Sequence, residues 1–228
     1  MRLVRQASIS MMVGGALALA VGVAACSSDA ANIGGSGGTT GGSGGRTGDA
    51  STGDTAAAAI TVTSSALSEG GTFSPQNTCA GANTSPPLSW TAGPAGTMSY
   101  AVALTDLSIN AVHWVIYDIP VGTTSLPANL PDGATLTTPV MAKQIHRAAF
   151  FGAGSVYRGP CPSGNLHNYQ FEVNAIPTAA LTGIAAGADG GPPTSDGVQA
   201  AAKAASLAHG DLTGMSNATA PPADASGQ

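Results

Sequence analysis

The sequence predicts a mainly β protein, an antiparallel β-sandwich with one or two short helices at its periphery. Short runs rich in β-branched and aromatic residues recur along the middle of the chain, at residues 60–63, 100–104, 113–119 and 169–176. The segments between them are rich in proline and glycine and show no amphipathic helical pattern. Since a βαβ fold would need helices in those connections, the pattern favours a sandwich.

Apolar and polar residues alternate in the last of these runs. Tyr169, Phe171, Val173 and Ala175 alternate with Gln170, Glu172 and Asn174. This period of two is typical of a strand with one face in the core and the other toward solvent. The large aromatic rings of Trp90 and Trp114 are also predicted to lie in the core.

One helix is predicted at residues 196–208, where the interior is rich in alanine. Ser195 or Asp196 could cap its start, and Gly210 follows directly after its end. A second short helix is predicted after Pro177.

The N-terminus has the pattern of an export signal. Arg2 and Arg5 precede an apolar run at residues 11–23, and Val23-Ala24-Ala25-Cys26 closes it with small residues. This resembles a bacterial lipoprotein signal, which implies cleavage before Cys26 and a lipid on its sulfur. The following Ser27 suits sorting to the outer membrane, so we expect an exported protein, lipid-anchored in the bacterial cell envelope. A plain secretory signal is the alternative.

The chain then divides into a tether and a single folded domain. Residues in the tether are almost all small or polar, with two Gly-Gly-Ser-Gly-Gly-type runs, which is typical of a flexible linker. After Gly214 the sequence again becomes polar and rich in alanine and proline, which indicates a disordered tail. The predicted parts are a signal peptide at 1–25, a lipidated cysteine and tether at 26–57, a domain at 58–217 and a tail at 218–228.

The charge of the chain argues against nucleic acid as a partner. Only 8% of the residues are charged, and the formal net charge is -5. Loss of Arg2 and Arg5 with the signal peptide would leave five basic and twelve acidic residues, or about -7. No basic patch remains to hold a phosphate backbone.

The cysteines predict a disulfide. If Cys26 carries a lipid, Cys79 and Cys161 remain as a pair in an oxidising compartment, and we expect them to be bonded. Two free thiols near the pocket are the alternative.

The segment at residues 157–169 predicts a small polar pocket. It combines the Gly159-Pro160 corner and a further glycine with His167, and it leads into a predicted strand. A loop stiffened by glycine and proline can present backbone N–H groups to an anion without a large ordering cost.

Three segments, taken in order, resemble the phosphatidylethanolamine-binding protein family, and within it the bacterial Raf-kinase-inhibitor-like branch. They are Ser85-Pro86-Pro87-Leu88-Ser89-Trp90, then Asp106 followed by His113-Trp114, then Tyr157-Arg158-Gly159-Pro160-Cys161-Pro162 with His167 and Tyr169. The resemblance covers residues 60–215 and implies a β-sandwich of the phosphatidylethanolamine-binding type with one anion pocket. The pocket residues that it implies are Asp106, His113, Gly159, Pro160, Cys161, His167 and Tyr169.

The chemistry of these side chains suits phosphate or phosphoethanolamine. Imidazoles and backbone N–H groups donate to phosphate oxygens, while Asp106 can accept from an amine or fix an imidazole tautomer. Each also has a structural interpretation: a half-buried strand histidine, an ordinary strand tyrosine, or an aspartate that caps a loop. His146, placed in a connecting segment, and His209, placed at the end of the predicted helix, are given no function.

The chain departs from the family pattern at several places, which include a short loop from Asp106 to His113 and the lack of a counterpart to the aromatic residue that lines the pocket in eukaryotic relatives. Asp106-Leu107-Ser108 stands where the family usually has Asp-Pro-Asp, Ala149-Phe150-Phe151-Gly152 stands for Asn-Asp-Phe-Gly, and Ser163 replaces a second proline. These departures affect the identity of the ligand more than the existence of the pocket.

Three functions follow from these observations. The first is a non-catalytic, membrane-tethered binding module for a small anion such as phosphate, a phospholipid headgroup or a carboxylate. The alternative is a protein-interaction module that inhibits a protease or kinase through a surface loop. A hydrolase is a third possibility, but Gly154 directly precedes Ser155 where a Gly-x-Ser-x-Gly elbow needs a spacer. We expect no cofactor and no metal, since a bonded Cys161 could not ligate zinc.

Overall fold

The computed structural model describes residues 59–152 and 154–221 of the chain. The predicted signal peptide, Cys26 and the tether lie outside the described residues, as do residues 222–228 of the predicted tail. The strands are β1 (Val62–Thr63), β2 (Gly71–Thr72), β3 (Leu88–Trp90), β4 (Ser99–Asp106), β5 (Ala111–Pro120), β6 (Ser125–Leu126), β7 (Thr135–Leu136), β8 (Ala142–His146), β9 (His167–Ile176) and β10 (Ala208–Ser216). The α-helices are α1 (Ala148–Phe151) and α2 (Ser195–Ala205).

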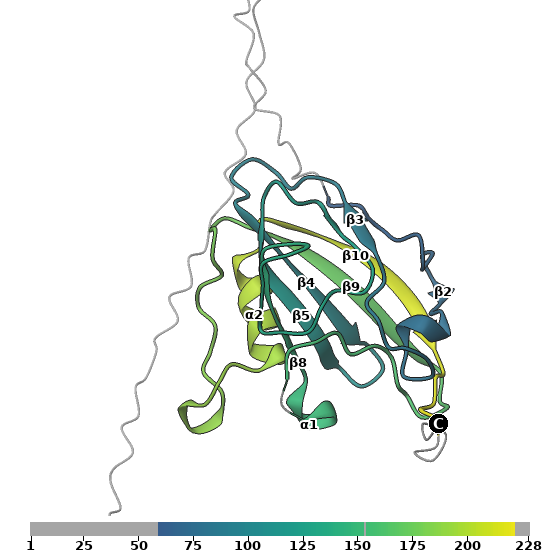
Figure 1. Cartoon of the computed structure of the whole chain (residues 1–228). Coiled ribbons are helices and arrows are strands. Elements are labelled where there is room, and N and C mark those ends of the chain that lie inside the picture. The colour runs from purple at the N-terminus through teal and green to yellow at the C-terminus, as the bar shows by residue number, and fades with distance from the viewer. Residues whose placement is uncertain (1–58, 153, 222–228) are drawn as a thin grey trace, which may run out of the picture. The chain divides into compact units, whose positions relative to one another are not determined.

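Two sheets of unequal size form the sandwich. The large sheet has the strand order β2-β10-β9-β4-β5-β8-β7 and the small one β1-β3-β6. Neighbouring strands are antiparallel except for β10 and β2. The long strands β4, β5, β9 and β10 run side by side, with α2 beside them (Figure 1). The prediction of a mainly β, antiparallel sandwich with short peripheral helices is confirmed.

Strand β4 explains why the large sheet is covered on both faces. Its large side chains, Tyr100 and Leu104 among them, belong to the core shared with the small sheet, in which Trp90 and Trp114 also lie as predicted. Its alternate residues, Ala101 and Ala103, pack in a second cluster with Val198, Ala201 and Ala202 of α2. The three helical residues have the i, i+3, i+4 spacing of one helix face, and the alanines leave room for a close approach.

The polar face of β9 is not exposed, which corrects the half-buried pattern predicted for this strand. Glu172 and Asn174 are only 6% and 2% exposed, because α2 covers this face of the sheet. Lys203 of α2 forms an ion pair with Glu172 at 3.0 Å, and the Asn174 amide donates to the same carboxylate at 2.7 Å. The polar residues of β9 therefore join the sheet to the helix.

The C-terminal part of the domain differs most from the prediction. Helix α2 ends at Ala205 rather than at 208, and its start is capped by Thr194, whose hydroxyl accepts from the Gly197 N–H. The predicted helix end at 208, the residues after it and the first residues beyond Gly214, where the tail is predicted to begin, together form β10, which pairs with β9 along its whole length. His209 consequently lies in a strand and not at a helix end.

The described helices are all short. No helix forms at residues 177–187, where the second one was predicted, and a single 3-10 turn follows at Ala188–Gly190. The four-residue α1 instead follows β8. Among the described residues, no helix is long and apolar enough to span a membrane.

Candidate functional site

A β-bulge in strand β5 positions His113. Leu104 pairs with Trp114, but the next residue of β4, Thr105, pairs with Val112, so His113 is the extra residue opposite β4. Such bulges change the direction in which a side chain points. The ring of His113 lies 5.4 Å from that of Tyr169, which is part of the inner core.

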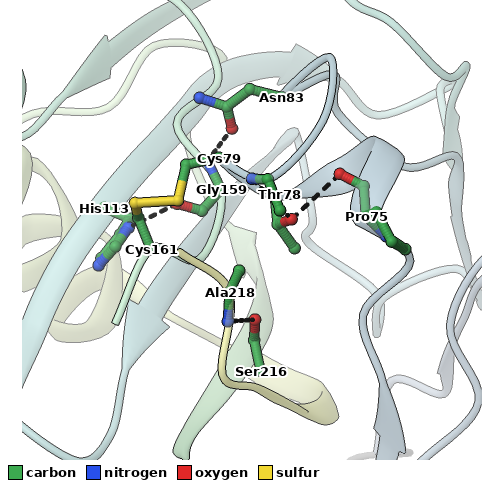
Figure 2. The surroundings of a disulfide bond; sticks show 10 residues. Pro75, Thr78, Cys79, Asn83, His113, Gly159, Cys161, Ser216 and Ala218 are labelled. Carbon is green, nitrogen blue, oxygen red and sulfur yellow. Dashed lines mark hydrogen bonds between the residues drawn. A yellow bond between two sulfur atoms is a disulfide. The ribbon is translucent and has the colours of Figure 1, made fainter. Parts of the chain in front are cut away.

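The ring of His113 is held by the turn predicted to form the pocket. Nδ1 lies 3.2 Å from the carbonyl oxygen of Gly159 (Figure 2). A carbonyl can only accept, so Nδ1 carries the proton and Nε2 is left with no hydrogen bond to the described residues. Burial lowers the pKa of His113 below its ordinary value of 6.5, and the charge of Asp106 opposes this only in part. The ring is therefore neutral at neutral pH.

Gly159 is packed so tightly that no side chain could replace its hydrogen. Its N–H donates to the Asn83 side chain at 2.9 Å (Figure 2). A Cβ built on this residue would lie 2.1 Å from the carbonyl oxygen of Asn77. Glycine is required here by the close approach of another backbone.

The predicted disulfide is present beside this corner. Cys79 and Cys161 are bonded, with their Cα atoms 5.3 Å apart (Figure 2). The N–H of Cys79 also donates to the carbonyl oxygen of Pro160 at 3.1 Å. The disulfide and this hydrogen bond together attach the turn to the loop before β3.

Asp106 orients the second histidine. Its Oδ2 atom accepts from Nδ1 of His167 at 2.7 Å, and its Oδ1 atom accepts from the N–H of Ser108 at 2.9 Å. The carboxylate is almost fully buried. Asp106 thus fixes an imidazole tautomer, one of the two roles considered for it, and leaves Nε2 of His167 without a hydrogen bond to the described residues.

Tyr169 is a buried hydroxyl between the two imidazoles. It pairs with Asp106 across β9 and β4, and its ring is 6.4 Å from that of His167. Its oxygen is buried and meets no partner at good hydrogen-bond geometry among the described residues, although Asp106 and the Cys161 backbone lie near enough to affect its pKa. Burial, and then the charge of Asp106, raise the pKa of Tyr169, so that the hydroxyl stays protonated and can donate.

The predicted site residues gather at one end of the large sheet, where β4 ends and where β5 and β9 begin. A cavity of about 350 Å³ opens there, and three of the predicted residues, His113, Cys161 and His167, line it. The other four do not line the cavity but contact residues that position its wall. Asp106 accepts a hydrogen bond from His167, and Gly159 accepts one from His113. Pro160 accepts one from the N–H of Cys79, and the ring of Tyr169 packs near both imidazoles.

The remaining wall residues were not predicted as site residues. They are Ile109, Phe150, Phe151, Pro162 and Ser163. The rings of Phe151 and Phe150 lie 5.5 and 6.0 Å from that of His113. In the sequence the two phenylalanines stand out only as a departure from the family pattern, because helix α1, which brings them to the cavity, has no sequence signal of its own.

Two arginines flank the aromatic wall. The guanidinium of Arg147 lies 4.8 Å from the centre of the Phe150 ring, and that of Arg158 lies 5.8 Å from the Phe151 ring. Arg147 also pairs with Asp196 at 2.6 Å. For Arg158 the described residues provide no such carboxylate. The potential at this wall is therefore more positive than the acidic net charge of the chain implies.

His146 does not lie in a connecting segment, as predicted, but is the last residue of β8 and is buried. Its Nε2 atom lies 2.9 Å from the carbonyl oxygen of Gly152. It does not line the cavity of His113 and His167. No group of three or more metal-ligating side chains occurs among residues 59–152 and 154–221.

Fold and site together define a β-sandwich protein with a small histidine-lined cavity at one sheet end. Residues 63–217 match the model of the family described as "Phosphatidylethanolamine-binding protein". The chain therefore belongs to the phosphatidylethanolamine-binding protein family, which confirms the resemblance drawn from its three segments.

Relatives and a solved structure agree with this assignment. The chain is 36% identical to a UPF0098 protein of Methanothermobacter thermautotrophicus over 117 residues, which are 50% of this chain and 74% of that protein. It is 32% identical to the lipoprotein-named LppC of Mycobacterium tuberculosis over 167 residues, 71% of this chain and 73% of LppC. The crystal structure of Escherichia coli YbcL, described as a member of the mammalian PEBP family, aligns with a TM-score of 0.58 at 26% identity, covering 71% of this chain and all of YbcL.

Proposed function

We propose that this protein is a non-catalytic binding module whose cavity takes a small anion of the phosphate class, either free or as a phospholipid headgroup. The observation that carries the proposal is the presence of His113 and His167 in the wall of one cavity of about 350 Å³. This volume lies in the range of small-ligand sites.

The protonation pattern of the wall favours phosphate in its monoanionic form. His113 and His167 both use Nδ1 for a protein acceptor, so Nε2 is the atom that each can offer to a ligand. A neutral ring accepts at Nε2, and a protonated ring donates there. A phosphate monoanion, free or as a monoester, carries both a P–OH donor and P–O acceptors, so it can satisfy such a pair without a full positive charge in the buried site. The phosphodiester of a phospholipid headgroup has no P–OH and would need a ring that donates at Nε2.

The surroundings supply further favourable charge. The guanidinium of Arg158 lies 5.8 Å from the ring of Phe151, a wall residue, and has no carboxylate partner among the described residues, whereas the charge of Arg147 is paired with Asp196. Pocket donors of this kind act locally, so the net charge of -5 does not oppose anion binding.

A binding role fits better than catalysis because no nucleophile is activated. Among the described residues, neither His113 nor His167 accepts a hydrogen bond from a hydroxyl or thiol, and Cys161 is held in the disulfide. Activation of a serine, threonine or cysteine by an adjacent general base would need such a bond.

We also propose that the module is tethered to a bacterial membrane by a lipid on Cys26. The support is the lipobox-like sequence before this residue and the lipoprotein name of the similar LppC. Labelled palmitate should enter the wild-type chain in a bacterial host and not a Cys26→Ala variant. Labelling of the variant would disprove the anchor.

Titration with inorganic phosphate, followed by NMR, tests the pocket. The wild type should show saturable shifts of amides near the cavity, and a double variant with His113→Ala and His167→Ala should lose them. His209→Ala is the matched control, because this histidine lies on β10 outside the cavity. Phosphoethanolamine as a second ligand separates a headgroup preference from simple phosphate binding. Absence of shifts with either ligand would refute the proposal.

A second candidate is a protein-interaction module that inhibits a protease or kinase. The observation that favours it is the exposure of two apolar wall residues, Ile109 at 53% and Phe150 at 49%. A pull-down distinguishes the two functions: the double histidine variant keeps a protein partner that binds the surface loop, but loses one that is bound through a phosphate in the cavity.

A further inference from the structure

The cavity of His113 and His167 is larger than a phosphate ion. Its volume is about 350 Å³. The five heavy atoms of phosphate would fill less than half of such a volume if each occupies roughly the 30 Å³ of a liquid water molecule. The cavity therefore has room for a group attached to the anion, and the chemistry of its walls decides which group fits.

The polar and apolar walls of this cavity lie at different depths. The histidines are buried or partly buried, whereas Ile109 and Phe150 are 53% and 49% exposed. The Nε2 atoms of His113 and His167 are not among the buried, unpaired side-chain atoms of the described residues, so both retain accessible surface. An anion held by the imidazoles consequently lies at the inner end of the cavity, and a group attached to it meets the apolar residues at the mouth.

Phe150 is held in place at the mouth although half of its surface is exposed. The guanidinium of Arg147 lies 4.8 Å from the centre of its ring, and both carboxylate oxygens of Asp196 lie within 2.7 Å of one nitrogen of that guanidinium. The ring of Phe151 meets that of Phe150 edge to face, with the ring centres 6.0 Å apart and an angle of 89° between the planes. The aromatic surface is thus formed before a ligand binds, which lowers the ordering cost of binding.

The walls contain no group that favours a positively charged substituent. None of the residues that line the cavity is acidic, and the carboxylate of Asp106 is used by His167 and by the N–H of Ser108. The face of a phenylalanine ring can attract an ammonium ion. Here, however, the guanidinium groups of Arg147 and Arg158 already lie 4.8 and 5.8 Å from the two rings. An ammonium group at the mouth would meet positive charge and no carboxylate of the wall.

We propose, on the basis of the anion site proposed above, that the ligand is a phosphate monoester of an uncharged apolar group, best an aromatic one, and that the site discriminates against phosphoethanolamine. The phosphate lies against the imidazoles, and the apolar group packs on Ile109, Phe150 and Phe151. Two departures from the family pattern agree with this class, because Phe150 and Ser108 each stand where the family usually has an aspartate. Carboxylates at these positions could accept from an ammonium group, and this chain lacks both.

Inorganic phosphate and three monoesters test this class of ligand. Ethyl phosphate and phosphoethanolamine differ only in the ammonium group, and phenyl phosphate carries a ring. The full chain is titrated by NMR at about pH 5, where all four probes are monoanionic at phosphate because the second pKa of a phosphate ester is near 6. Phenyl phosphate should bind about tenfold more tightly than inorganic phosphate, because the wall removes its ring from water. Phosphoethanolamine should bind at least about threefold more weakly than ethyl phosphate, because its ammonium lacks a partner of opposite charge.

Variants of Phe150 locate the apolar part of the site. Phe150→Ala should weaken the binding of phenyl phosphate by about fivefold and that of inorganic phosphate by less than about twofold. Met141→Ala is the matched control, since it also removes an exposed apolar side chain, at 64%, but does not line this cavity, and it should leave both affinities unchanged. Phe150→Asp places a carboxylate at the mouth and should invert the order of phosphoethanolamine and ethyl phosphate.

The outcomes separate the class of ligand from the anion site itself. If inorganic phosphate binds as tightly as phenyl phosphate, or phosphoethanolamine as tightly as ethyl phosphate, this class of ligand is wrong while the anion site stands. An effect of Phe150→Ala no larger than that of Met141→Ala would also overturn it. If none of the four probes binds, the anion site is refuted and the class of ligand with it.

Discussion

Nδ1 of His113 donates to the carbonyl oxygen of Gly159, 46 residues further along the chain, at 3.2 Å. This bond connects the bulge of β5 to the Gly-Pro corner and decides which ring nitrogen faces the cavity. The corner is itself fixed by Asn83 and by the disulfide. The orientation of His113 therefore depends on residues that never touch a ligand.

Gly159→Ala should destabilise the domain strongly. The new Cβ would lie 2.1 Å from the Asn77 carbonyl oxygen, so one of the two backbones must move. We expect a loss of about 2 to 3 kcal/mol in the free energy of unfolding, measured by urea denaturation. Gly122→Ala is the control, because nothing lies within 4 Å of its Cβ position, and it should change stability by less than about 0.5 kcal/mol. Equal effects of the two changes would contradict the packing argument.

Removal of the disulfide should weaken both stability and phosphate binding. The bridge joins residues 82 positions apart, for which the chain-entropy model gives about 4 to 5 kcal/mol. A double variant with Cys79→Ser and Cys161→Ser should lose most of this in denaturation experiments. It should also bind phosphate more weakly in the NMR titration, because Cys161 forms part of the cavity wall. A loss below about 1 kcal/mol would mean that the other contacts of the loop hold it without the bridge.

The pH dependence of stability should contain a contribution from His113. Because burial lowers the pKa of this residue, the unfolded chain takes up a proton below its ordinary value of 6.5 while the folded chain does not. Stability should therefore fall as the pH decreases from 6.5, until the pH is below the lowered pKa of the folded state. His113→Phe should remove up to about 1.4 kcal/mol per pH unit of this slope. Unfolding curves between neutral and acidic pH measure it, and identical slopes in both proteins would exclude a buried, neutral His113.

The sequence predicted the sandwich because β-branched runs and Pro/Gly connections are local signals, but β10 was missed for a physical reason. Gly210 and Gly214 resemble a helix end and the start of a tail. In the fold, a Cβ on Gly210 would lie 1.8 Å from the Ile60 carbonyl oxygen, and one on Gly214 would lie 2.8 Å from Leu67. These glycines serve a close approach between segments distant in sequence, which local patterns do not contain.

The site could be predicted only in part for the same kind of reason. The three motifs pointed to His113, Cys161 and His167, and the structure brings these into one cavity. The bulge that redirects His113 depends on pairing with β4, and the approach of Phe151 depends on where α1 packs. Both are tertiary properties without a periodic sequence signal.

Replacement of Ser163 by proline, the residue usual in the family at this position, tests how the rim of the cavity is formed. The N–H of Asn165 donates to the carbonyl oxygen of Pro162 at 3.3 Å, and Ser163 and Gly164, the two residues between them, have φ angles of 55° and 91°. Positive φ at both central positions defines a type I′ turn. The ring of proline fixes φ near -65°, so the proline usual in the family cannot adopt this turn.

Ser163→Pro should therefore lower the melting temperature and weaken phosphate binding, since the rim beside His167 must rearrange. Ser163→Gly is the matched control: it also removes the hydroxyl but accepts a positive φ, and we expect near wild-type stability. Calorimetry and the NMR titration give the two readouts. If Ser163→Gly alone abolishes phosphate binding, the hydroxyl and not the turn is what the ligand requires. If Ser163→Pro binds and melts like the wild type, the left-handed turn has no role in forming the cavity.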